Sequence, residues 1–254
     1  MPVYVITGAR TGIGLEYVRQ LSRAVPPQSN TIFAVVRKLD SDLTALRAVQ
    51  SSVPNPETKV HIVECDISSP ASIAALPDRI RNANPSNPAA EIRIDTLINN
   101  AATLHSREET ALSLTPSALQ SHIASNVLGP ALVLQALLPL LSPRAKVANV
   151  SSGIASMALV RDGSIKAEIT PYSVSKAALN MLTVHQARQL RGIDAYKEVV
   201  VVAVDPGHVK TEMGGPNAVV EVADSASGVL KVLEGLGVKD TGRFLLYTGA
   251  ELPW

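Results

Sequence analysis

A tyrosine and a lysine that could share a proton lie four residues apart, as Tyr172 and Lys176 in the segment YSVSK. Thr170 and Pro171 precede them and are typical of an N-cap and a first helical residue, which predicts both side chains on one face of a helix. A tyrosine pKa near about 10 is too high for exchange at neutral pH, but a cation and a helix N-terminus favour the phenolate. The spacing therefore predicts a tuned proton donor. A half-buried tyrosine beside a surface lysine is the alternative.

A glycine-spaced turn follows the first apolar run of the chain, with glycines at Gly8, Gly12 and Gly14. The order G-x-x-x-G-x-G differs from the usual G-x-G-x-x-G fingerprint of dinucleotide sites. Glycine nevertheless lets the backbone approach a phosphate closely, and the N-terminus of a following helix offers free N–H groups and a positive dipole end. The turn predicts a nucleotide site, with an ordinary glycine-rich turn as the alternative.

Basic residues near this turn indicate which nicotinamide cofactor would bind. An acidic residue at the end of the second strand would hold a free ribose 2′-OH, whereas a 2′-phosphate calls for arginine. Arg37 and Lys38 follow that strand, and Arg10 lies within the glycine turn. Because a guanidinium binds phosphate through two N–H groups, we expect NADP(H) rather than NAD(H). Solvated surface cations are the alternative.

The elements that must position these residues alternate along the chain as short β-branched runs and helical stretches. Nearly continuous apolar runs are typical of strands covered on both faces, and parallel pairing requires crossover helices. We therefore expect an α/β fold: a Rossmann-type doubly wound, seven-stranded parallel sheet with helices on both faces, in a single domain over residues 1–254. The expected strands are 3–7, 31–36, 59–64, 96–99, 146–150, 199–204 and 244–247, and the expected helices 14–24, 42–52, 71–82, 116–141, 171–191 and 222–236.

Residues with polar or glycine chemistry follow several of these strands. In doubly wound sheets, ligands bind outside the carboxyl ends of the strands. The residues concerned are Gly8, Asp66, Asn100, Ser151 with Ser152, and Pro206 with Gly207. The sequence therefore predicts one site along one edge of the sheet.

Composition limits the classes of partner. The 254 residues are 46% hydrophobic and 18% charged, enough to bury the core of one large domain. A formal net charge of +1 gives no sign of a nucleic acid or anionic membrane partner, so a small molecule is expected. Cys65 is the only cysteine, which excludes an internal disulfide, and the histidines lack metal-ligand spacing. We expect no metal site.

Targeting signals are not expected either. The apolar run 127–141 is shorter than the roughly 18 residues that span a bilayer and is expected to form a buried helix. The chain enters a strand at residue 3, which leaves no room for a charged leader. A cytoplasmic location in a reducing compartment is the expectation.

Taken in order, the motifs resemble those of the short-chain dehydrogenase/reductase family over nearly the whole chain. Those motifs are the turn 7–14, Asn99-Asn100-Ala101-Ala102, Asn126, Ser151-Ser152, Tyr172 with Lys176, and the segment 206–211. The segments 209–215 and 242–254 look most like the sniffer-type carbonyl reductases and C-factor-like proteins.

This resemblance implies roles for individual residues. Tyr172 would be the general acid of carbonyl reduction, Ser152 would bind the substrate oxygen, and Asn126 would anchor a proton-relay water. Lys176 would hold the nicotinamide ribose and lower the tyrosine pKa. The cofactor-binding residues implied in the same way are Gly8, Arg10, Thr11, Gly12, Ile13, Gly14, Arg37, Asp66, Ile67, Asn100, Ala101, Tyr172, Lys176, Pro206, Gly207, Val209 and Thr211.

Two departures from the family pattern stand out. Ala102 replaces the last glycine of N-N-A-G, and its extra methyl narrows the approach to the cofactor without preventing binding. The stretch 156–169 places Tyr172 20 positions after Ser152 and is expected to form a loop over the substrate side. Because this connection is long, Ser151 remains an alternative to Ser152 as the catalytic serine.

The favoured function is an NADPH-dependent reductase of aldehydes or ketones. A nucleotide-binding regulator on the same fold is a second hypothesis, but it would not need Ser, Tyr and Lys together. An alcohol dehydrogenase working in the oxidative direction is a third. A related isomerase or epimerase would need a larger C-terminal region than 214–254. A homodimer or homotetramer is a further expectation, built on the helices near 127–141 and Tyr172.

Overall fold

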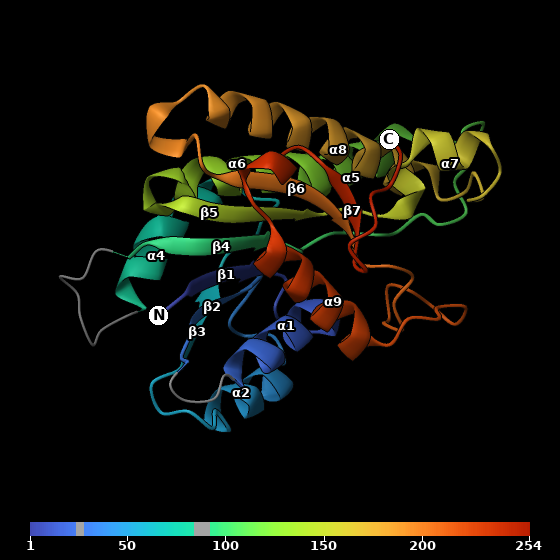
Figure 1. Ribbon diagram of the computed structural model, residues 1–254. Coiled ribbons are helices and arrows are strands. Elements are labelled where there is room, and N and C mark those ends of the chain that lie inside the picture. The colour runs from blue at the N-terminus through green and yellow to red at the C-terminus, as the bar shows by residue number, and fades with distance from the viewer. Residues whose placement is uncertain (24–27, 84–91) are drawn as a thin grey trace.

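Seven parallel strands form one sheet within residues 1–23, 28–83 and 92–254, the part of the chain that the computed structural model describes. Their order is β3-β2-β1-β4-β5-β6-β7. The chain therefore works outward from β1 in one direction and then from β4 in the other, which is the doubly wound arrangement. Figure 1 shows the sheet between two layers of helices. The predicted α/β, Rossmann-type fold is confirmed.

Three strands have the expected bounds, β4 and β5 begin earlier than expected, β6 is shifted by one residue, and β7 ends one residue early. Strand β5 reaches back to Leu141 rather than Lys146, and its pairing with β4 shifts register between Ile94 and Thr96. Pro143 lies in this early part and has no backbone N–H to donate to a neighbouring strand. For this reason the sequence did not predict a strand there. The strands are β1 (Val3–Thr7), β2 (Thr31–Val36), β3 (Lys59–Glu64), β4 (Ile94–Asn99), β5 (Leu141–Val150), β6 (Val200–Asp205) and β7 (Phe244–Leu246).

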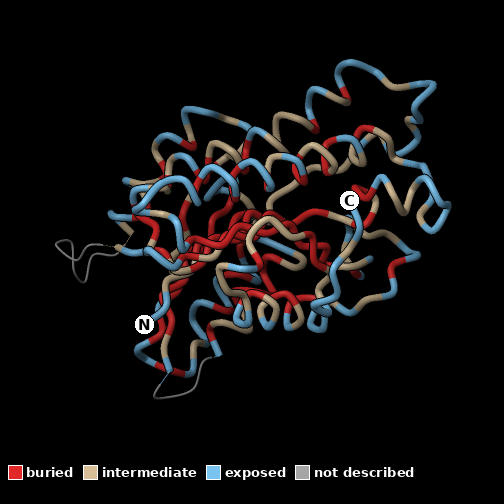
Figure 2. The backbone as a smooth tube through the Cα atoms, turned by 45° about the horizontal axis from the view of Figure 1, so that its top comes forward, coloured by how far each residue is buried: buried red, intermediate tan, exposed pale blue. Residues whose placement is uncertain are grey.

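Helices cover both faces of the sheet and build two separate cores. Helices α1, α2 and α9 pack on one face through residues such as Tyr17 and Val229, and the remaining long helices pack on the other through residues such as Leu137 and Leu190. In Figure 2 the buried strands run through the middle of the molecule. The helices are α1 (Gly12–Ser22), α2 (Thr44–Ser51), α3 (Pro70–Ala74), α4 (Leu76–Asn82), α5 (Pro116–Ile123), α6 (Gly129–Leu137), α7 (Met157–Arg161), α8 (Thr170–Arg191) and α9 (Val222–Gly235).

Helix boundaries correct the sequence-based expectations at several places. The helix expected over 71–82 divides at Ala75, because Pro77 cannot donate a backbone N–H to the preceding turn. The expected loop 156–169 contains helix α7, whose N-cap Ser156 accepts a hydrogen bond from the Leu159 N–H at 3.1 Å. The expected end of the first helix at Ala24 lies outside the described residues.

A continuous helical run, Pro116–Leu140, agrees with the helix expected over 116–141 to within one residue. It joins α5, a π-helical turn at Ala124–Leu128, α6 and a 3₁₀ turn. With 25 residues and a mean hydropathy of 1.6, it has the length and composition to cross a membrane, and 44% of that apolar window is buried in the fold. Within this fold, α5 contacts α8, while α6 contacts α3 and α4.

The phenol of Tyr17 provides a test of the packing between α1 and the sheet. Its ring is fully buried, and its hydroxyl has no hydrogen-bond partner among the described residues. An unsatisfied buried hydroxyl costs stability, so Tyr17→Phe is expected to raise the free energy of unfolding by about 1 kcal/mol. Urea unfolding measures this change. Tyr196→Phe, at a half-buried ring, is the control and should change stability little. A destabilised Tyr17→Phe variant would contradict the prediction.

Candidate active site

The glycine turn after β1 is held against the end of β4 with almost no free space. Gly8 and Gly12 have φ angles of +71° and +58°, in the left-handed region that favours glycine. A Cβ at Gly8 would lie 2.8 Å from the Cα of Ala101, and one at Gly14 would lie 2.7 Å from Nδ2 of Asn100. The glycines therefore let two strand ends and a helix N-terminus meet.

Thr7 and Asn100 form the hydrogen bonds that fix this meeting point. The backbone N–H groups of Asn100 and Ala101 each donate to Thr7 Oγ1 at 3.0 Å. The Asn100 side chain donates from Nδ2 to the Thr7 carbonyl at 3.0 Å and to the Gly8 carbonyl at 3.4 Å. Sequence reasoning predicted Asn100 but did not assign a role to Thr7, whose hydroxyl becomes important only when β1 and β4 are neighbours.

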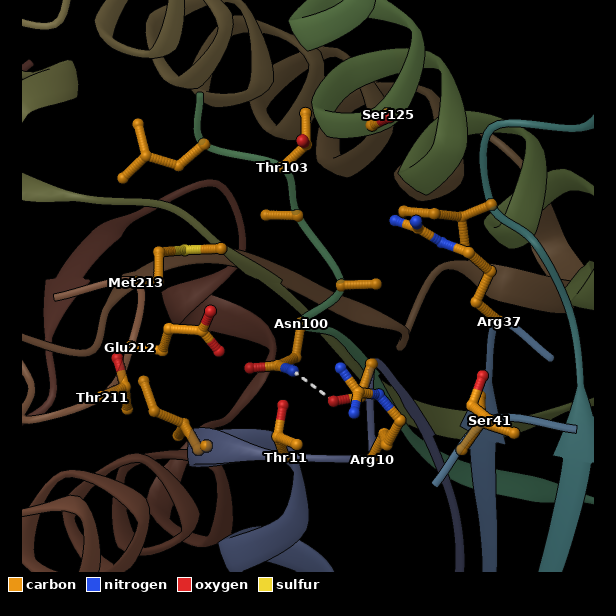
Figure 3. A pocket seen from close by; sticks show the side chains of 18 of the residues that line it. Arg10, Thr11, Arg37, Ser41, Asn100, Thr103, Ser125, Thr211, Glu212 and Met213 are labelled. Carbon is orange, nitrogen blue, oxygen red and sulfur yellow. Dashed lines mark hydrogen bonds between the residues drawn. The ribbon is translucent and has the colours of Figure 1, made fainter. Parts of the chain in front are cut away.

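A cavity of about 1020 Å³ opens at this edge, between the ends of the strands. Arg10, Arg37 and Ser41 lie on one side of it, opposite Thr211 and Met213 (Figure 3). A Cβ at Gly12 would approach Thr211 Cγ2 to 3.4 Å, so the loop after β6 covers the glycine turn. The two arginines expected to select a 2′-phosphate thus line one cavity.

The structure brings most, but not all, of the predicted cofactor residues to this cavity. The residues that line it are Gly8, Arg10, Thr11, Gly12, Ile13, Arg37, Ile67, Asn100, Ala101 and Thr211. Asp66 instead accepts hydrogen bonds from the backbone and hydroxyl of Ser68. Val209 is buried and pairs with Val220. Gly14, Tyr172, Lys176, Pro206 and Gly207 lie in the elements around the cavity rather than on its lining.

Asn126 lies in the π-helical turn Ala124–Leu128 and is fully buried. Its Oδ1 accepts from the Thr103 N–H at 2.8 Å, and its Nδ2 donates to the Thr103 carbonyl and to Ser175 Oγ, both at 3.0 Å. A π turn inside an α-helix is costly and is often found at functional sites. Here it places one amide between the loop after β4 and helix α8.

The two serines after β5 have different surroundings. Ser151 is buried, and its hydroxyl donates to Asn180 Oδ1 on α8 at 2.7 Å. Ser152 is half-buried, and no protein hydrogen bond of its side chain is found among the described residues. Because successive side chains of a strand point to opposite sides, Ser151 is directed toward the helix layer. The geometry therefore favours Ser152, and not Ser151, as the serine available to a ligand.

Helix α8 begins in an unusual backbone conformation. Thr170 is its first residue rather than the N-cap, which is Ile169 with a φ of +54°. Positive φ is an outlier for a β-branched residue and indicates local strain held by the surroundings. Pro171 follows within the first turn, so Tyr172 does lie near the helix N-terminus as expected.

Burial dominates the electrostatics of the Tyr172 and Lys176 pair. The Lys176 Nζ donates to the Val150 carbonyl at 2.6 Å and lies 5.6 Å from the centre of the Tyr172 ring. Burial lowers the pKa of Lys176 to about 7. Burial also raises the pKa of Tyr172, and the Asp205 carboxylate raises it further, while Arg107 opposes the rise. The sequence predicted a lowered tyrosine pKa, whereas the chain by itself raises it.

His122 is a site neighbour that sequence reasoning set aside as structural. Its ring is fully buried and contacts Tyr172 edge-to-face, with ring centres 6.3 Å apart. Nδ1 lies 2.8 Å from the Ala118 carbonyl, which fixes Nε2 as the acceptor for the His105 N–H at 3.4 Å. The available signal was its position four residues before Asn126 on the same helix.

The chain matches the family described as short chain dehydrogenase over residues 2–219. It is 40% identical over 164 residues to C-signal of Myxococcus xanthus, a match that covers 63% of this chain and 93% of that protein.

The chain is also similar to solved structures over its full length. The NADPH-bound carbonyl reductase from chicken fatty liver is 31% identical, with a TM-score of 0.82 and 100% of both chains covered. The carbonyl reductase Sniffer of D. melanogaster is 25% identical, with a TM-score of 0.84 and 100% of both chains covered.

The different surroundings of the two serines lead to a stability test. Ser151→Ala leaves the buried Asn180 Oδ1 without its donor and is expected to lower the free energy of unfolding by about 1–3 kcal/mol. Ser152→Ala removes no buried hydrogen bond within the protein and should change stability by less than about 0.5 kcal/mol. Chemical unfolding of the two matched variants measures both values. Equal losses would contradict the assignment of Ser151 to the core.

Proposed function

The chain belongs to the short-chain dehydrogenase family, and on this basis we propose that it is an NADPH-dependent reductase of aldehyde or ketone carbonyl groups. The observations that carry this proposal are the two arginines, Arg10 and Arg37, in one cavity, and the bonds of Asn126, which joins the lining residue Thr103 to the helix of Tyr172 and Lys176. Two similar solved structures are those of carbonyl reductases, which supports the same reaction. We also propose that residues 1–254 fold as one domain, act in the cytoplasm and assemble as a homodimer or homotetramer.

The residues around the cavity fit a dinucleotide with a 2′-phosphate. Gly8 and Gly12 line the cavity without a side chain of their own, so the backbone there can approach a diphosphate closely. The N-terminus of α1 offers free N–H groups at this point. Arg10 and Arg37 would hold the 2′-phosphate, because a guanidinium binds phosphate through two parallel hydrogen bonds. When bound, NADPH supplies the hydride that carbonyl reduction needs.

Tyr172 and Ser152 would act on the carbonyl oxygen. Both side chains come from elements fixed in the core, Ser152 from the end of β5 and Tyr172 from the first turn of α8. Hydrogen bonds from preorganised donors stabilise the negative charge that grows on this oxygen during reduction. Tyr172 would then donate its proton. Its raised pKa keeps the phenol protonated at neutral pH, as a proton donor requires.

Lys176 and Asn126 would support this proton transfer. The buried Lys176 ammonium lies beside the Tyr172 ring, where its charge would lower the phenol pKa as the proton leaves. Asn126 holds the loop after β4 and Ser175 of α8 at fixed distances. We propose that it also anchors the water through which the proton is replaced.

Two other functions lead to different observations. A nucleotide-binding regulator on the same fold would bind NADPH without oxidising it. An alcohol dehydrogenase working in the oxidative direction would reduce NADP⁺ with an alcohol at a rate above that of carbonyl reduction. NADPH oxidation with a panel of aldehydes, ketones and quinones therefore tests the proposal, and no oxidation with any of them would contradict it.

Removing the Tyr172 hydroxyl tests the proton donor. Tyr172→Phe is expected to lower the reduction rate by at least about 100-fold, because general acid catalysis is worth roughly 10²- to 10⁴-fold. NADPH binding, measured by fluorescence titration, should remain. Tyr196→Phe serves as the control with unchanged rate. A near wild-type rate for Tyr172→Phe would rule out the mechanism.

Reversing the charge of Arg37 tests the choice of cofactor. Arg37→Asp is expected to lower the ratio of kcat/KM for NADPH over NADH by at least about tenfold, since a charge-assisted hydrogen bond contributes roughly 1.5–3 kcal/mol. Arg47→Asp makes the same change of charge on the exposed side of α2, away from the cavity. The assignment is wrong if both variants keep the wild-type ratio.

A further inference from the structure

A buried carboxylate, Asp205, lies at the end of β6 and has no part in the mechanism above. Only 9% of the residue is exposed. Its Oδ1 accepts a hydrogen bond from the Gly207 N–H at 2.9 Å, and the Gly153 N–H also lowers the pKa of the carboxyl group. A Cβ at Gly153 would lie 3.0 Å from Asp205 Oδ2, which shows how closely the two groups pack.

The two N–H groups belong to the segments that follow β5 and β6. The ladder between β5 and β6 ends at the pair Val150 and Val204, and one more bond joins the Ser151 N–H to the Val204 carbonyl at 2.7 Å. Beyond this point the two backbones need other partners for their polar groups. The Asp205 carboxylate accepts the Gly207 N–H and packs closely against Gly153, so it joins the segment that carries Ser152 to the loop that begins at Pro206.

Asp205 also affects the proposed proton donor through its charge. Its negative charge is one cause of the raised Tyr172 pKa, after burial. The other titratable groups around Tyr172 are Arg107 from the loop after β4, His122 from α5 and Lys176 from its own helix. Of these charged neighbours, Asp205 is the one that favours the protonated phenol.

Several groups around Asp205 act on the pKa and the position of its carboxylate. Burial raises its pKa, while the Gly207 and Gly153 N–H groups and the nearby His208 oppose the rise. His208 is itself held by a contact of 2.8 Å between its Nε2 and the Gly214 carbonyl. Ile165, from the segment after α7, packs within 3.0 Å of the position that a Gly153 Cβ would occupy. The stretch 156–169 therefore packs against Gly153, next to the carboxylate.

We propose that Asp205 is a positioning residue for the reduction, one that holds the Ser152 segment and the Pro206 loop in a single geometry beside Tyr172. This inference rests on the proposed reductase function. Asp205 touches neither substrate nor cofactor; it acts by fixing the backbone next to Ser152 and by its charge near the phenol. If Asp205 served only the stability of the fold, its replacement would lower the free energy of unfolding. It would change neither kcat nor the pH dependence of kcat.

Asp205→Asn tests both effects with little change of shape. The amide keeps one acceptor oxygen but loses the charge and the second acceptor. We expect kcat to fall by roughly 10- to 100-fold, since small misplacements of catalytic groups have costs of this size, with the Kd for NADPH close to wild type. Without the negative neighbour the Tyr172 pKa falls, so the phenol loses its proton at lower pH. The alkaline limb of the kcat profile should therefore move to lower pH.

Two further variants separate geometry, charge and simple stability. Gly153→Ala keeps the Asp205 charge but displaces the carboxylate, and should lower kcat while the alkaline limb stays near its wild-type position. Asp240→Asn is the matched control. Asp240 is also buried, and its carboxylate accepts a hydrogen bond from the Gly237 N–H at 3.0 Å. It precedes β7, however, and so lies at the amino ends of the strands, away from the site. Its kcat and pH profile should remain those of the wild type.

A titration without substrate keeps this inference distinct from the proposed function. Ionised tyrosine absorbs in the ultraviolet. The absorbance of each protein minus that of the same protein with Tyr172→Phe reports the ionisation of Tyr172 alone. The phenol of Asp205→Asn should ionise at lower pH than that of the wild type, whether or not any carbonyl is reduced. If it ionises at the same pH, or if Asp240→Asn loses as much kcat as Asp205→Asn, the positioning role is wrong. An inactive wild type would contradict the reductase function instead.

Discussion

The hydroxyl of Thr7 joins the two strands at which the sheet changes direction, and the site depends on that junction. It accepts the N–H groups of Asn100 and Ala101, both at 3.0 Å, just where β1 and β4 end. With these bonds in place, the Asn100 amide reaches the carbonyls of the glycine turn. A parallel sheet leaves a crevice at such a point because the neighbouring connections run to opposite faces. The width of this crevice is fixed because the Thr7 side chain holds the ends of β1 and β4 together.

A second set of buried polar contacts holds α8 against the sheet. The Asn149 amide donates to Thr183 Oγ1 and Gln186 Oε1, both at 2.9 Å, and accepts from the Asn99 Nδ2 at the same distance. Ser151 adds a bond to Asn180 on the same helix. Buried hydrogen bonds of this kind have strict geometry, because an unmade bond in the core is costly. They fix the rotation and height of α8, and so the position of Tyr172 in its first turn.

Burial and charge act in opposite senses on the Tyr172 and Lys176 pair. The spacing of the two residues favours the phenolate, but removal from water favours the neutral form of each group and has the larger effect. The chain therefore holds a protonated phenol next to a lysine whose pKa is about 7. Asp205 acts in the same sense as burial on the phenol. Small changes in the charges around this pair would change which form is present near neutral pH.

The sequence by itself determined the order of strands and helices, the edge of the sheet that carries the site, and ten of the residues that line its cavity. It could do so because apolar periodicity, glycine spacing and proline positions act locally. Tertiary structure alone decided between Ser151 and Ser152, gave Thr7, His122 and Asp205 their contacts, and reversed the expected shift of the Tyr172 pKa. These outcomes depend on burial and on partners as far as 94 residues away in the chain, as for Thr7 and Ala101. Neither burial nor such distant partners can be read from local spacing, because both arise only when separate strands pack side by side.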